Sequence, residues 1–486
     1  MGRAVRLSKE GFGGRTVQRK GFTGADVPAG RGGILGAPVK GRKVLVIGAG
    51  FAGLACAAAL HKANVDVTVL EARDRVGGRA WTLRDFADGR PVEAGAMMIH
   101  GSEASIHKWA GEFGLEVRRT PSFRGGRIFY GGRLQSTVGF VLHGLSRIRT
   151  AIQMERTLPR AIERYHGPDM SLRDFLASQK ATPLAKEFTA RTYGSIDAAE
   201  PEELSVRGLA EESNVATGGL PWANYQVSEG IEEIAVRRAK ELGDRVLLRR
   251  RVTRIEWSGP RVRVQAESPT GDERYEADAV VVTVPLGVLK AGDIAFDPPL
   301  PEAKRQAIEA LGYGHVNKVL LLFDEAARAT PLGKAVFLAR MEGDWYFMPY
   351  HGVRDGPVVL EGFIGGRRAK EIAGRPEREV VEQIVRLLEE MIPGFDVRGH
   401  LKAARVIDWS SDPLSRGGYS FPAIGGGIEV RRRLAEPLGG VLFFAGEATH
   451  FEGEHATLHG ALDSGERAAR ELLAARRAHE RTPDGN

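Results

Sequence analysis

Gly48, Gly50 and Gly53 have the GxGxxG spacing that lets a backbone turn approach a phosphate closely. An apolar run precedes them at residues 43–47 and an alanine-rich run, LACAAALHKA, follows, which predicts a strand, a tight turn and a helix in that order. Backbone N–H groups at the start of such a helix attract a pyrophosphate. Glycines that serve only a tight crossover show the same spacing, so the motif alone is weak evidence.

Glu71 adds a second group at this site, 23 residues after Gly48 and at the end of a second predicted strand, residues 65–70. A carboxylate at this point can accept hydrogen bonds from the hydroxyls of a ribose. An acidic side chain there also argues against a cofactor with a 2′-phosphate. Together these residues predict one dinucleotide-binding βαβ unit of about 30 residues.

A second glycine pair follows the carboxylate. Gly77 and Gly78 stand among Arg73, Arg75 and Arg79, and guanidinium groups suit bidentate contacts to a diphosphate. A charged surface turn is the alternative interpretation of Arg75.

Lys318 is the candidate for chemistry rather than binding. It lies in Asn317–Phe323, whose other members are nearly all apolar, so the lysine is either at the wet start of a strand or inward and paired. Desolvation would lower its pKa and allow it to handle a proton. A solvated lysine at a strand edge is the alternative.

The distribution of charge does not favour a nucleic-acid partner. Lys and Arg exceed Asp and Glu by 69 − 62 = 7, but residues 1–43 alone carry ten basic and two acidic side chains, so the other 443 residues sum to −1. The excess therefore belongs to a basic leader, residues 1–40, which is predicted to be disordered, and no nucleic-acid partner is expected.

A membrane segment and a disulfide scaffold are not expected either. Residues 44–60 are uncharged behind the basic leader, but this run contains three glycines and falls short of a usual span. The single cysteine, Cys56, has no internal disulfide partner and excludes a zinc finger, so we expect no metal site. A reducing compartment is compatible with this, and a cytoplasmic location is predicted.

The elements that must position these residues alternate between helix and strand. Residues 106–225 have helical periodicity and read as a mostly helical insertion. Residues 245–284 contain short β-branched runs, at 245–248, 252–257 and 262–265, which predict a three-stranded meander that returns to a buried strand at 279–284. Further on we expect helices at 301–312, 377–391 and 457–476 and buried strands at 319–323 and 441–444.

LEARDRVGGR, residues 70–79, resembles the GG signature of flavin-containing amine oxidases. The similarity continues through most of residues 41–475 and includes EAGAMMIHG at 93–101, TVPLGVL at 283–289, FAGEAT at 444–449 and TLHGALDSGE at 457–466. The chain is therefore identified as a member of that family. The resemblance implies an α/β fold, with a Rossmann-like FAD-binding domain of the GR2 (glutathione-reductase-like) type and an α+β substrate-binding domain inserted in two segments. The boundaries predicted are 41–105, 226–300 and 403–475 for the former and 106–225 and 301–402 for the latter.

The resemblance also implies cofactor contacts. Gly95 and Met98 would lie beside the isoalloxazine ring, and the backbone of Val252 would meet adenine. Glu447, after Gly446, would accept hydrogen bonds from ribityl hydroxyls, although an exposed turn carboxylate is the alternative. A helix that begins near Thr457 would aim its N–H groups at the N1/C2=O edge of the flavin. In the resembling family a lysine placed like Lys318 holds a water against flavin N5.

Subfamily signals favour polyamine oxidases over monoamine oxidases. Tyr419 matches one wall of the aromatic sandwich of monoamine oxidases, but the second wall position is Thr457, not tyrosine. Thr457 and His100 are instead similar to residues of polyamine oxidases and of lysine-specific histone demethylases, and His100 as an ordinary packed histidine is equally compatible. Gly418 stands where covalently flavinylated members place cysteine, so non-covalent FAD is expected.

Two features of the predicted pocket allow alternative interpretations. Six acidic residues of the helical insertion could attract a polycation, although a solvated helix face is the favoured interpretation: Asp197, Glu200, Glu202, Glu203, Glu211 and Glu212. Glu454 and His455 stand where polyamine-type relatives usually carry aromatic or small residues, so the pocket could be rewired.

We therefore expect an FAD-dependent amine oxidase, monomeric or homodimeric. A primary or secondary amine or a polyamine would pass a hydride from its α-carbon to flavin N5. The imine would hydrolyse to an aldehyde or ketone plus an amine or ammonia, and O2 would reoxidise the flavin to give hydrogen peroxide. An L-amino-acid oxidase or an FAD-dependent desaturase of the same superfamily is the nearest alternative. A protein-binding module with the same fold and an NAD-dependent dehydrogenase are more distant ones.

Overall fold

The computed structural model describes residues 42–120, 125–142, 145–215, 223–340, 345–349 and 356–481, all within one compact unit, residues 39–486. The leader, residues 1–40, lies outside the described residues.

A five-stranded parallel sheet carries the glycine motif. Its strand order is β10 (Val246–Leu247), β2 (Asp66–Leu70), β1 (Lys43–Ile47), β14 (Ala279–Val282), β23 (Leu442–Phe444). Val44 and Val46 on one face of β1 pack into a core with α1 (Phe51–Lys62) and α17 (Leu458–Arg481), while Leu45 and Ile47 on the other face pack into a second core. Because both faces are buried, the strands are nearly continuous apolar runs, as parallel sheets require.

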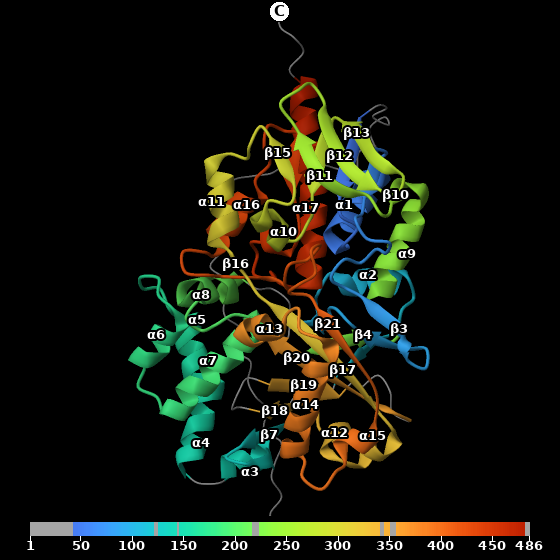
Figure 1. Cartoon of the computed structure of the whole chain (residues 1–486). Helices are drawn as coiled ribbons and strands as arrows, with labels where there is room; N and C mark the ends of the chain where they lie inside the picture. The colour runs from blue at the N-terminus through green and yellow to red at the C-terminus, as the bar shows by residue number, and fades with distance from the viewer. Residues whose placement is uncertain are drawn as a thin grey trace, which may run out of the picture. The chain divides into compact units, whose positions relative to one another are not determined.

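The two helices of the first core come from opposite ends of the described chain yet lie side by side (Figure 1). Gly465 of α17 allows this contact, because a Cβ there would stand 2.1 Å from the carbonyl oxygen of Ala52. The predicted strand at 43–47 is found as expected, but α1 begins at Phe51, three residues before the predicted start.

The predicted meander needs a correction. Its first run, near residues 246–247, is β10 at the edge of the parallel sheet. The meander itself consists of β11 (Arg251–Glu256), β12 (Val262–Ser268) and β13 (Gly271–Ala277). The third strand was missed because its sequence, GDERYEA, is polar on one side and lacks the β-branched run that marked the others. The meander and α10 (Leu286–Ala291), α11 (Glu302–Ala310) and α16 (Ile428–Ala435) supply the second core.

A seven-stranded mixed sheet forms the other half. Its order is β21 (Leu401–Asp408), β17 (Val316–Phe323), β20 (Val358–Gly365), β19 (Trp345–Pro349), β18 (Leu338–Arg340), β7 (Arg127–Tyr130), β8 (Arg133–Ser136). Val319 and Leu321 of β17 pack toward α14 (Glu377–Met391), which spans its predicted range. Leu320 and Leu322 pack on the opposite face, beside the hairpin of β3 (Thr82–Ala87) and β4 (Arg90–Glu93). Strand β21 crosses residue 402, the predicted domain boundary, and the boundaries remain predictions.

The segment 106–225 is helical but contributes strands as well. Its helices are α2 (Ile106–Glu112), α3 (Thr137–Leu142), α4 (Leu145–Ile152), the π-helix η2 (Gln153–Thr157), α5 (Leu158–Glu163), α6 (Leu172–Ser178), α7 (Pro183–Asp197) and α8 (Val206–Val215). Strands β7 and β8 join the large sheet, and β6 (Val117–Arg119) pairs with β9 (Asn224–Val227), which also pairs with β5 (Ile99–His100).

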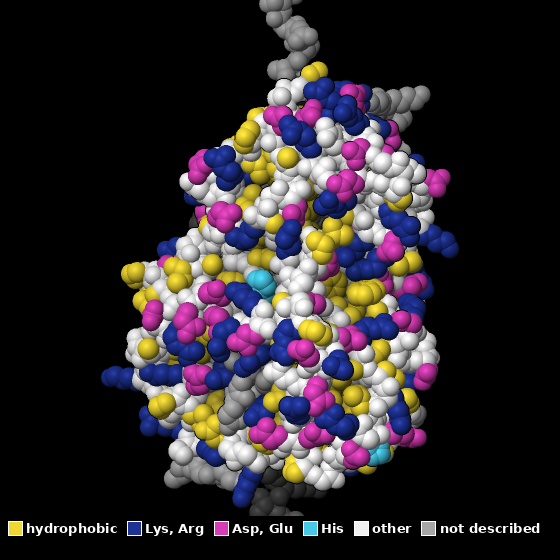
Figure 2. Space-filling view, viewed as in Figure 1, with side chains coloured by type: hydrophobic (Ala, Val, Ile, Leu, Met, Phe, Trp, Pro, Cys, Tyr) yellow, Lys and Arg dark blue, Asp and Glu magenta, His cyan; other side chains and the backbone are white. Residues whose placement is uncertain are grey.

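Among the described helices, none is both long and apolar enough to cross a bilayer. Basic and acidic side chains are interspersed over the face shown in Figure 2.

Candidate active site

The glycine loop between β1 and α1 is shaped for close backbone approach. A Cβ at Gly53 would stand 1.9 Å from the carbonyl oxygen of Gly48, and a Cβ at Gly48 would stand 2.8 Å from Thr283 Oγ1. At Gly50, in contrast, no atom lies within 4 Å of the Cβ position, so this side of the loop is open. Gly50 also has no side chain to cap α1. An open backbone turn at an uncapped helix N-terminus fits the diphosphate of a dinucleotide.

Glu71 holds this loop in place. Its Oε2 accepts a hydrogen bond from the N–H of Ala49 at 2.7 Å and its Oε1 accepts one from the N–H of Arg73 at 2.8 Å. Burial raises the pKa of Glu71, and the two N–H donors oppose that rise. A carboxylate oxygen has lone pairs beyond one such bond, so the predicted ribose contact and the observed structural role are compatible.

The three arginines near the glycine pair have different partners. Arg73 donates to Asp412 at 2.5 Å. Arg75 donates to carbonyl oxygens of its own loop and to Glu232, so it braces the glycine turn and is not a free surface charge. Arg79 donates to Glu447 at 3.0 Å, which brings the two signatures near the ends of the chain together.

Glu447 is the centre of the site. Its carboxylate accepts hydrogen bonds from Arg79, from the N–H and Oγ of Ser420 and from the N–H of Ala456. Burial raises the pKa of this carboxyl, but Arg79 and the hydrogen bond from Ser420 outweigh it and the net pKa is lowered. The alternative of an exposed turn carboxylate is wrong, because Glu447 is buried.

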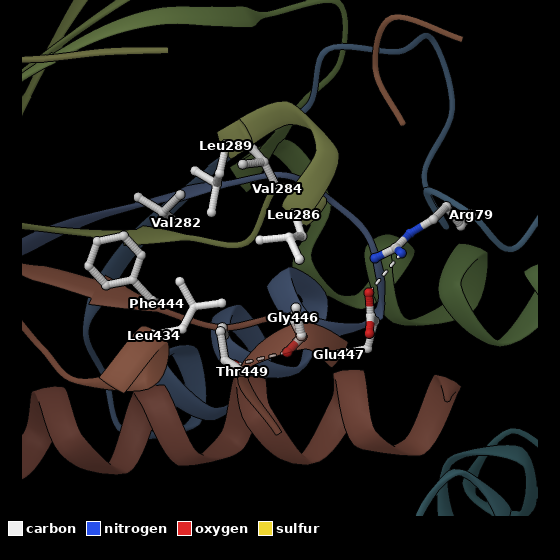
Figure 3. A pocket seen from close by; sticks show the side chains of 12 residues that line it. Arg79, Val282, Val284, Leu286, Leu289, Leu434, Phe444, Gly446, Glu447 and Thr449 are labelled. Atoms are coloured by element: carbon white, nitrogen blue, oxygen red, sulfur yellow. Dashed lines mark hydrogen bonds and ion pairs between the residues drawn. The ribbon is translucent and has the colours of Figure 1, made fainter. Parts of the chain in front are cut away.

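A pocket opens beside this carboxylate, at the carboxyl ends of β14 and β23. Figure 3 shows Arg79 and Glu447 directed toward each other at one side of it. Apolar side chains form much of the remaining wall: Val282, Val284, Leu286, Leu289, Leu434 and Phe444. Ligands of open parallel sheets bind at this edge.

The other predicted cofactor contacts occupy different settings. Gly95 allows its segment to pass the carbonyl oxygen of Arg79, which a Cβ would approach to 1.9 Å. Met98 is half-buried against the core beside β3 and β4, and Val252 is buried in the meander. Gly446 has φ 124° and an open Cβ position, with the carbonyl oxygen of Thr283 as the nearest atom at 3.9 Å.

The side chain of His100 is exposed. Desolvation by the surrounding protein nevertheless lowers its pKa. Its Nδ1 lies 2.7 Å from Asn224 Oδ1, a partner on the adjacent strand β9. The ring is therefore oriented by a neutral amide, which leaves Nε2 for other contacts.

Lys318 is inward and paired, the second of its two predicted settings. It is 4 % exposed, its Nζ lies 2.8 Å from Glu361 Oε1, and it also donates to the carbonyl oxygen of Glu93 at 3.4 Å. Glu361 lies opposite Leu320 on β20 and so shares the sheet face of Lys318. Burial raises the pKa of Glu361, and Lys318 opposes the rise. The buried ammonium is thus held between a carboxylate and the β4 segment.

The side chains of Tyr419 and Thr457, the two predicted wall residues, each form a hydrogen bond with a backbone group. The Tyr419 hydroxyl donates to the carbonyl oxygen of Ile196 at 2.6 Å, and burial raises its pKa. Thr457 caps α17, since its Oγ1 accepts the N–H of Gly460 at 3.0 Å. Tyr419 precedes Ser420 and Thr457 follows Ala456, so both segments are tied to the carboxylate of Glu447.

The acidic stretch of the helical insertion divides into two groups. Asp197 and Glu212 are 6 % and 4 % exposed, which corrects the expectation of a solvated face for these two residues. The remaining four are at least partly exposed: Glu200, Glu202, Glu203 and Glu211. Burial and the charge of Glu212 together raise the pKa of Asp197 to about 7.

Arg431 and Glu361 are functional candidates that the sequence reasoning missed. Arg431 is fully buried and donates to Glu212 at 2.6 Å and to Ser420 Oγ at 2.7 Å. It stands in the run Arg431-Arg432-Arg433, which has the composition of a surface helix, so its burial had no local signal. A lone acid in the apolar run VVLEGFIG was the signal available for Glu361.

Comparisons with known proteins identify the family. A family model described as flavin containing amine oxidoreductase matches residues 51–473. Polyamine oxidase 4 of Oryza sativa subsp. japonica is 34 % identical over 88 % of this chain and 88 % of its own length. Polyamine oxidase 2 of Arabidopsis thaliana is 32 % identical over 88 % of this chain and 87 % of its own.

Two solved structures share the fold. A putrescine oxidase bound to putrescine has a TM-score of 0.76 at 23 % identity, over 89 % of this chain and 99 % of its own. Cyclohexylamine oxidase from Brevibacterium oxydans has a TM-score of 0.75 at 22 % identity, over 90 % of this chain and 99 % of its own.

Proposed function

The chain belongs to the family of flavin-containing amine oxidoreductases and is an FAD-dependent oxidoreductase that acts on amines, and from this premise we propose that it oxidises a C–N bond of a primary or secondary amine or polyamine. In this proposal FAD is bound non-covalently and O2 is the electron acceptor. A cytoplasmic location and a monomeric or homodimeric state remain predictions.

The convergence of three distant segments on Glu447 carries the proposal. Arg79 comes from the GG signature, Ser420 follows the predicted wall residue Tyr419, and Ala456 precedes the wall residue Thr457. One buried carboxylate therefore ties residues predicted to bind the cofactor to the neighbours of residues predicted to bind the substrate. A protein that only kept the fold for binding a partner would not need this connection.

The residues that would hold FAD follow from the fit of the loop. The open turn at Gly50 would take the diphosphate together with Arg73 or Arg79, and Glu71 would accept the adenosine ribose hydroxyls. Glu447 already accepts four hydrogen bonds, which use the lone pairs of a carboxylate, so its part would be to orient Arg79, Ser420 and Ala456 around the cofactor. When bound, FAD supplies an acceptor for the hydride equivalent of the substrate and passes the electrons on to O2.

Two observations support the non-covalent attachment. A Cβ at Gly418 would stand 2.5 Å from Val316 Cγ2, so a cysteine does not fit at the position where the covalently flavinylated members place one. Cys56 is buried in α1 and burial raises its pKa to about 12, so it is an inert thiol.

The chain's own groups would orient the amine and move its proton. Tyr419 would provide an apolar wall with a fixed ring, because its hydroxyl is anchored to Ile196. The N-terminus of α17 would place partial positive charge where negative charge develops in the reaction. Lys318 would hold or pass a proton at Nζ, and its two oxygen contacts keep the side chain in one position.

The substrate class is proposed from the buried acids. Asp197 is buried near Tyr419, whose pKa its charge helps to raise, and forms no side-chain hydrogen bond or ion pair with the residues that the structure describes. A carboxylate in that position is stabilised by a cation from the substrate. Two of the relatives named above are polyamine oxidases, which accords with a substrate of more than one amino group.

An anaerobic titration tests this function. Purified protein is mixed in turn with spermidine, benzylamine, tyramine and L-leucine while the visible absorbance of the flavin is recorded. We expect spermidine to bleach the flavin band. Bleaching by L-leucine alone would support the amino-acid oxidase alternative, and a flavin that none of the four bleaches would contradict amine oxidation.

A further inference from the structure

The pocket beside Glu447 is a small apolar cavity (Figure 3). Its volume is about 10 Å³, close to the least that holds one water, so it has room for one small molecule and not for a ring of a dinucleotide. Apolar side chains point toward this space: Val282, Val284, Leu286, Leu289, Leu434 and Phe444. The four that come from β14, α10, α16 and β23 belong to the second core and are each 1 % exposed. The cavity is therefore a gap in a hydrophobic core at the edge of the candidate site.

Water is a poor occupant of this cavity. A buried water typically makes about three hydrogen bonds to polar groups that are otherwise unsatisfied. The polar side chains of the wall already have protein partners, since Arg79 donates to Glu447 and Thr449 Oγ1 donates to the carbonyl oxygen of Gly446 at 2.9 Å. None of these wall side chains has an enclosed nitrogen or oxygen atom that lacks a partner. Apolar cavities of this kind stay dry and take up apolar molecules.

An ion is no better an occupant, because the two charges of the wall compensate each other. Arg79 and Glu447 form an ion pair at 3.0 Å, so the cavity offers no net charge. The amine, the imine and hydrogen peroxide of the proposed reaction all carry polar groups, which this wall would leave unpaired. O2 is the one participant that is both apolar and diatomic. The ligand chemistry of the cavity is therefore that of dissolved O2.

The cavity borders the predicted cofactor site without filling it. Three residues predicted to bind FAD line the cavity as well: Arg79, Gly446 and Glu447. Their segment is fixed, because the N–H of Ala445 donates to the carbonyl oxygen of Val282 at 3.0 Å and the N–H of Gly446 donates to Ser464 Oγ at 2.8 Å. Gly446 has no side chain that could close the space between the cavity and the cofactor. A molecule in the cavity is thus held next to the proposed position of FAD.

The wall also reaches the surface of the protein. Val284 and Leu289, which stand before and on α10, are half-buried, whereas the other four apolar side chains are buried. An apolar wall that extends to the surface suits the entry of an apolar molecule, since that molecule loses water on the way in.

We propose that this cavity is a binding site for O2, which holds the electron acceptor beside the flavin. The inference rests on the proposed function, in which O2 is the acceptor. There O2 takes up two electrons and two protons from the reduced flavin and leaves as hydrogen peroxide. The cavity supplies position and local concentration, and no protein group changes its oxidation state.

The first test detects O2 in the cavity directly. Dissolved O2 is paramagnetic and broadens the NMR signals of methyl groups close to it. The oxidised holoenzyme without amine does not consume O2, so its methyl-labelled spectra are recorded under N2 and under O2 pressure. We expect the methyl signals of Val282, Leu286 and Leu434 to broaden more than those of Leu388, which is equally buried in the core of the large sheet.

The second test fills the cavity and follows reoxidation of the flavin. The holoenzyme is reduced with one equivalent of dithionite and mixed with O2. Leu434→Phe should slow reoxidation about tenfold, because a molecule the size of two methylene groups loses its enrichment in an apolar space. Val282→Ile adds a single methylene group and should slow it to a smaller extent. Leu388→Phe is the matched control and should keep the wild-type rate. The anaerobic rate of bleaching by amine should be unchanged in all three variants.

The outcomes separate the inference from the proposed function. A wild-type flavin that no amine bleaches contradicts the proposed function, while the broadening and the reoxidation of dithionite-reduced enzyme still test the inference. Broadening that is no stronger at the cavity than at Leu388 overturns the inference, and so do equal reoxidation rates in wild type, Val282→Ile and Leu434→Phe. Flavin absorbance and melting temperature are recorded for every variant. If Leu434→Phe does not retain FAD, Val282→Ile and the wild-type spectra decide.

Discussion

Among the residues that the structure describes, two ion pairs have both side chains buried, and their surroundings differ. Lys318 and Glu361 lie 2.8 Å apart between strands of the large sheet, and the lysine has one further contact, to the carbonyl oxygen of Glu93. Arg431 and Glu212 lie 2.6 Å apart, and the arginine is also bonded to Ser420 and Ala448. All four side chains are at most 5 % exposed.

The difference indicates two uses of buried charge. A buried pair is stabilising only when further hydrogen bonds satisfy its remaining donors and acceptors. The arginine pair has more of these bonds, to Ser420 and Ala448, although Arg431 Nη2 and Glu212 Oε2 have no hydrogen-bond partner among the described residues. Ser420 also links the pair to Glu447, so it is suited to a structural role. The lysine pair has few other partners, which fits the proposed role in the chemistry better than a structural role.

The largest effect on stability is expected when the buried arginine pair loses its cation, Arg431. Arg431→Met leaves Glu212 buried without a counter-ion and removes the link to Ser420, which should lower the free energy of unfolding by about 3–5 kcal/mol. Chemical denaturation measures this. Arg431→Met combined with Glu212→Leu removes both charges and should recover much of the loss. A single variant as stable as wild type would show that the pair is not structural.

Lys318→Met probes the other pair and should separate rate from stability. The anaerobic rate of flavin bleaching by substrate should fall by about 10²–10⁴-fold, the range of a positioned proton-transfer group. FAD absorbance should remain, because Glu361 can take up a proton: burial already raises its pKa. Lys304, another buried lysine, bonds three carbonyl oxygens at the end of α16, so Lys304→Met is a matched control that should lower stability more than rate.

Asp197 is buried near Arg431 and Glu212 but forms no hydrogen bond with either of them. Its titration should therefore affect stability separately from that pair. Its pKa is raised to about 7, so the folded protein keeps a proton that the unfolded chain releases near the ordinary value of 3.8. Stability therefore falls as pH rises between these two values, and above them the full loss remains but no longer changes with pH. Asp197→Asn should flatten that part of the stability profile, as followed by melting temperature.

The same ionisation should affect substrate binding in the opposite sense. Above pH 7 Asp197 is charged and attracts a cationic amine, so KM should fall by roughly tenfold, which equals 1.4 kcal/mol, as pH rises through 7. Glu202→Gln is the control, an exposed acid of the same stretch. An unchanged KM profile in Asp197→Asn would separate this carboxyl from the substrate.

The smallest effect is expected at the edge of the site, at Thr457. Thr457→Val removes the cap of α17 and should cost about 1 kcal/mol of stability. Thr457→Ser keeps the hydroxyl and should retain the wild-type melting temperature. A loss of FAD affinity larger than the loss of stability would point to a direct role for the α17 N-terminus in the cofactor site.

The nucleotide-binding unit was predictable from sequence because its signals are local. The spacing of Gly48, Gly50 and Gly53 and the apolar runs on both sides depend only on neighbours in the chain, and α14 has a clear helical period. The pairing of Lys318 with Glu361 depends on strand register, with Glu361 opposite Leu320, and no local pattern specifies register.

Burial of single charges was equally inaccessible. Arg431 and its two arginine neighbours have the same composition, and only the helix face decides which of them enters the core. The six acidic residues of the insertion also differ in burial, since two of them are buried and four are at least partly exposed. Tertiary contacts, which composition does not encode, determine these differences.

The order of the strands in the parallel sheet has a consequence for biosynthesis. Strand β23 and helix α17 complete the sheet and its helical cover, and they bring Glu447 to the arginine of the GG signature. A ribosome makes the glycine loop and Glu71 long before it makes these residues. If the proposed FAD contacts hold, a nascent chain lacks those near Glu447 until this segment is made, and we expect stable uptake of the cofactor only after the last described helix is translated.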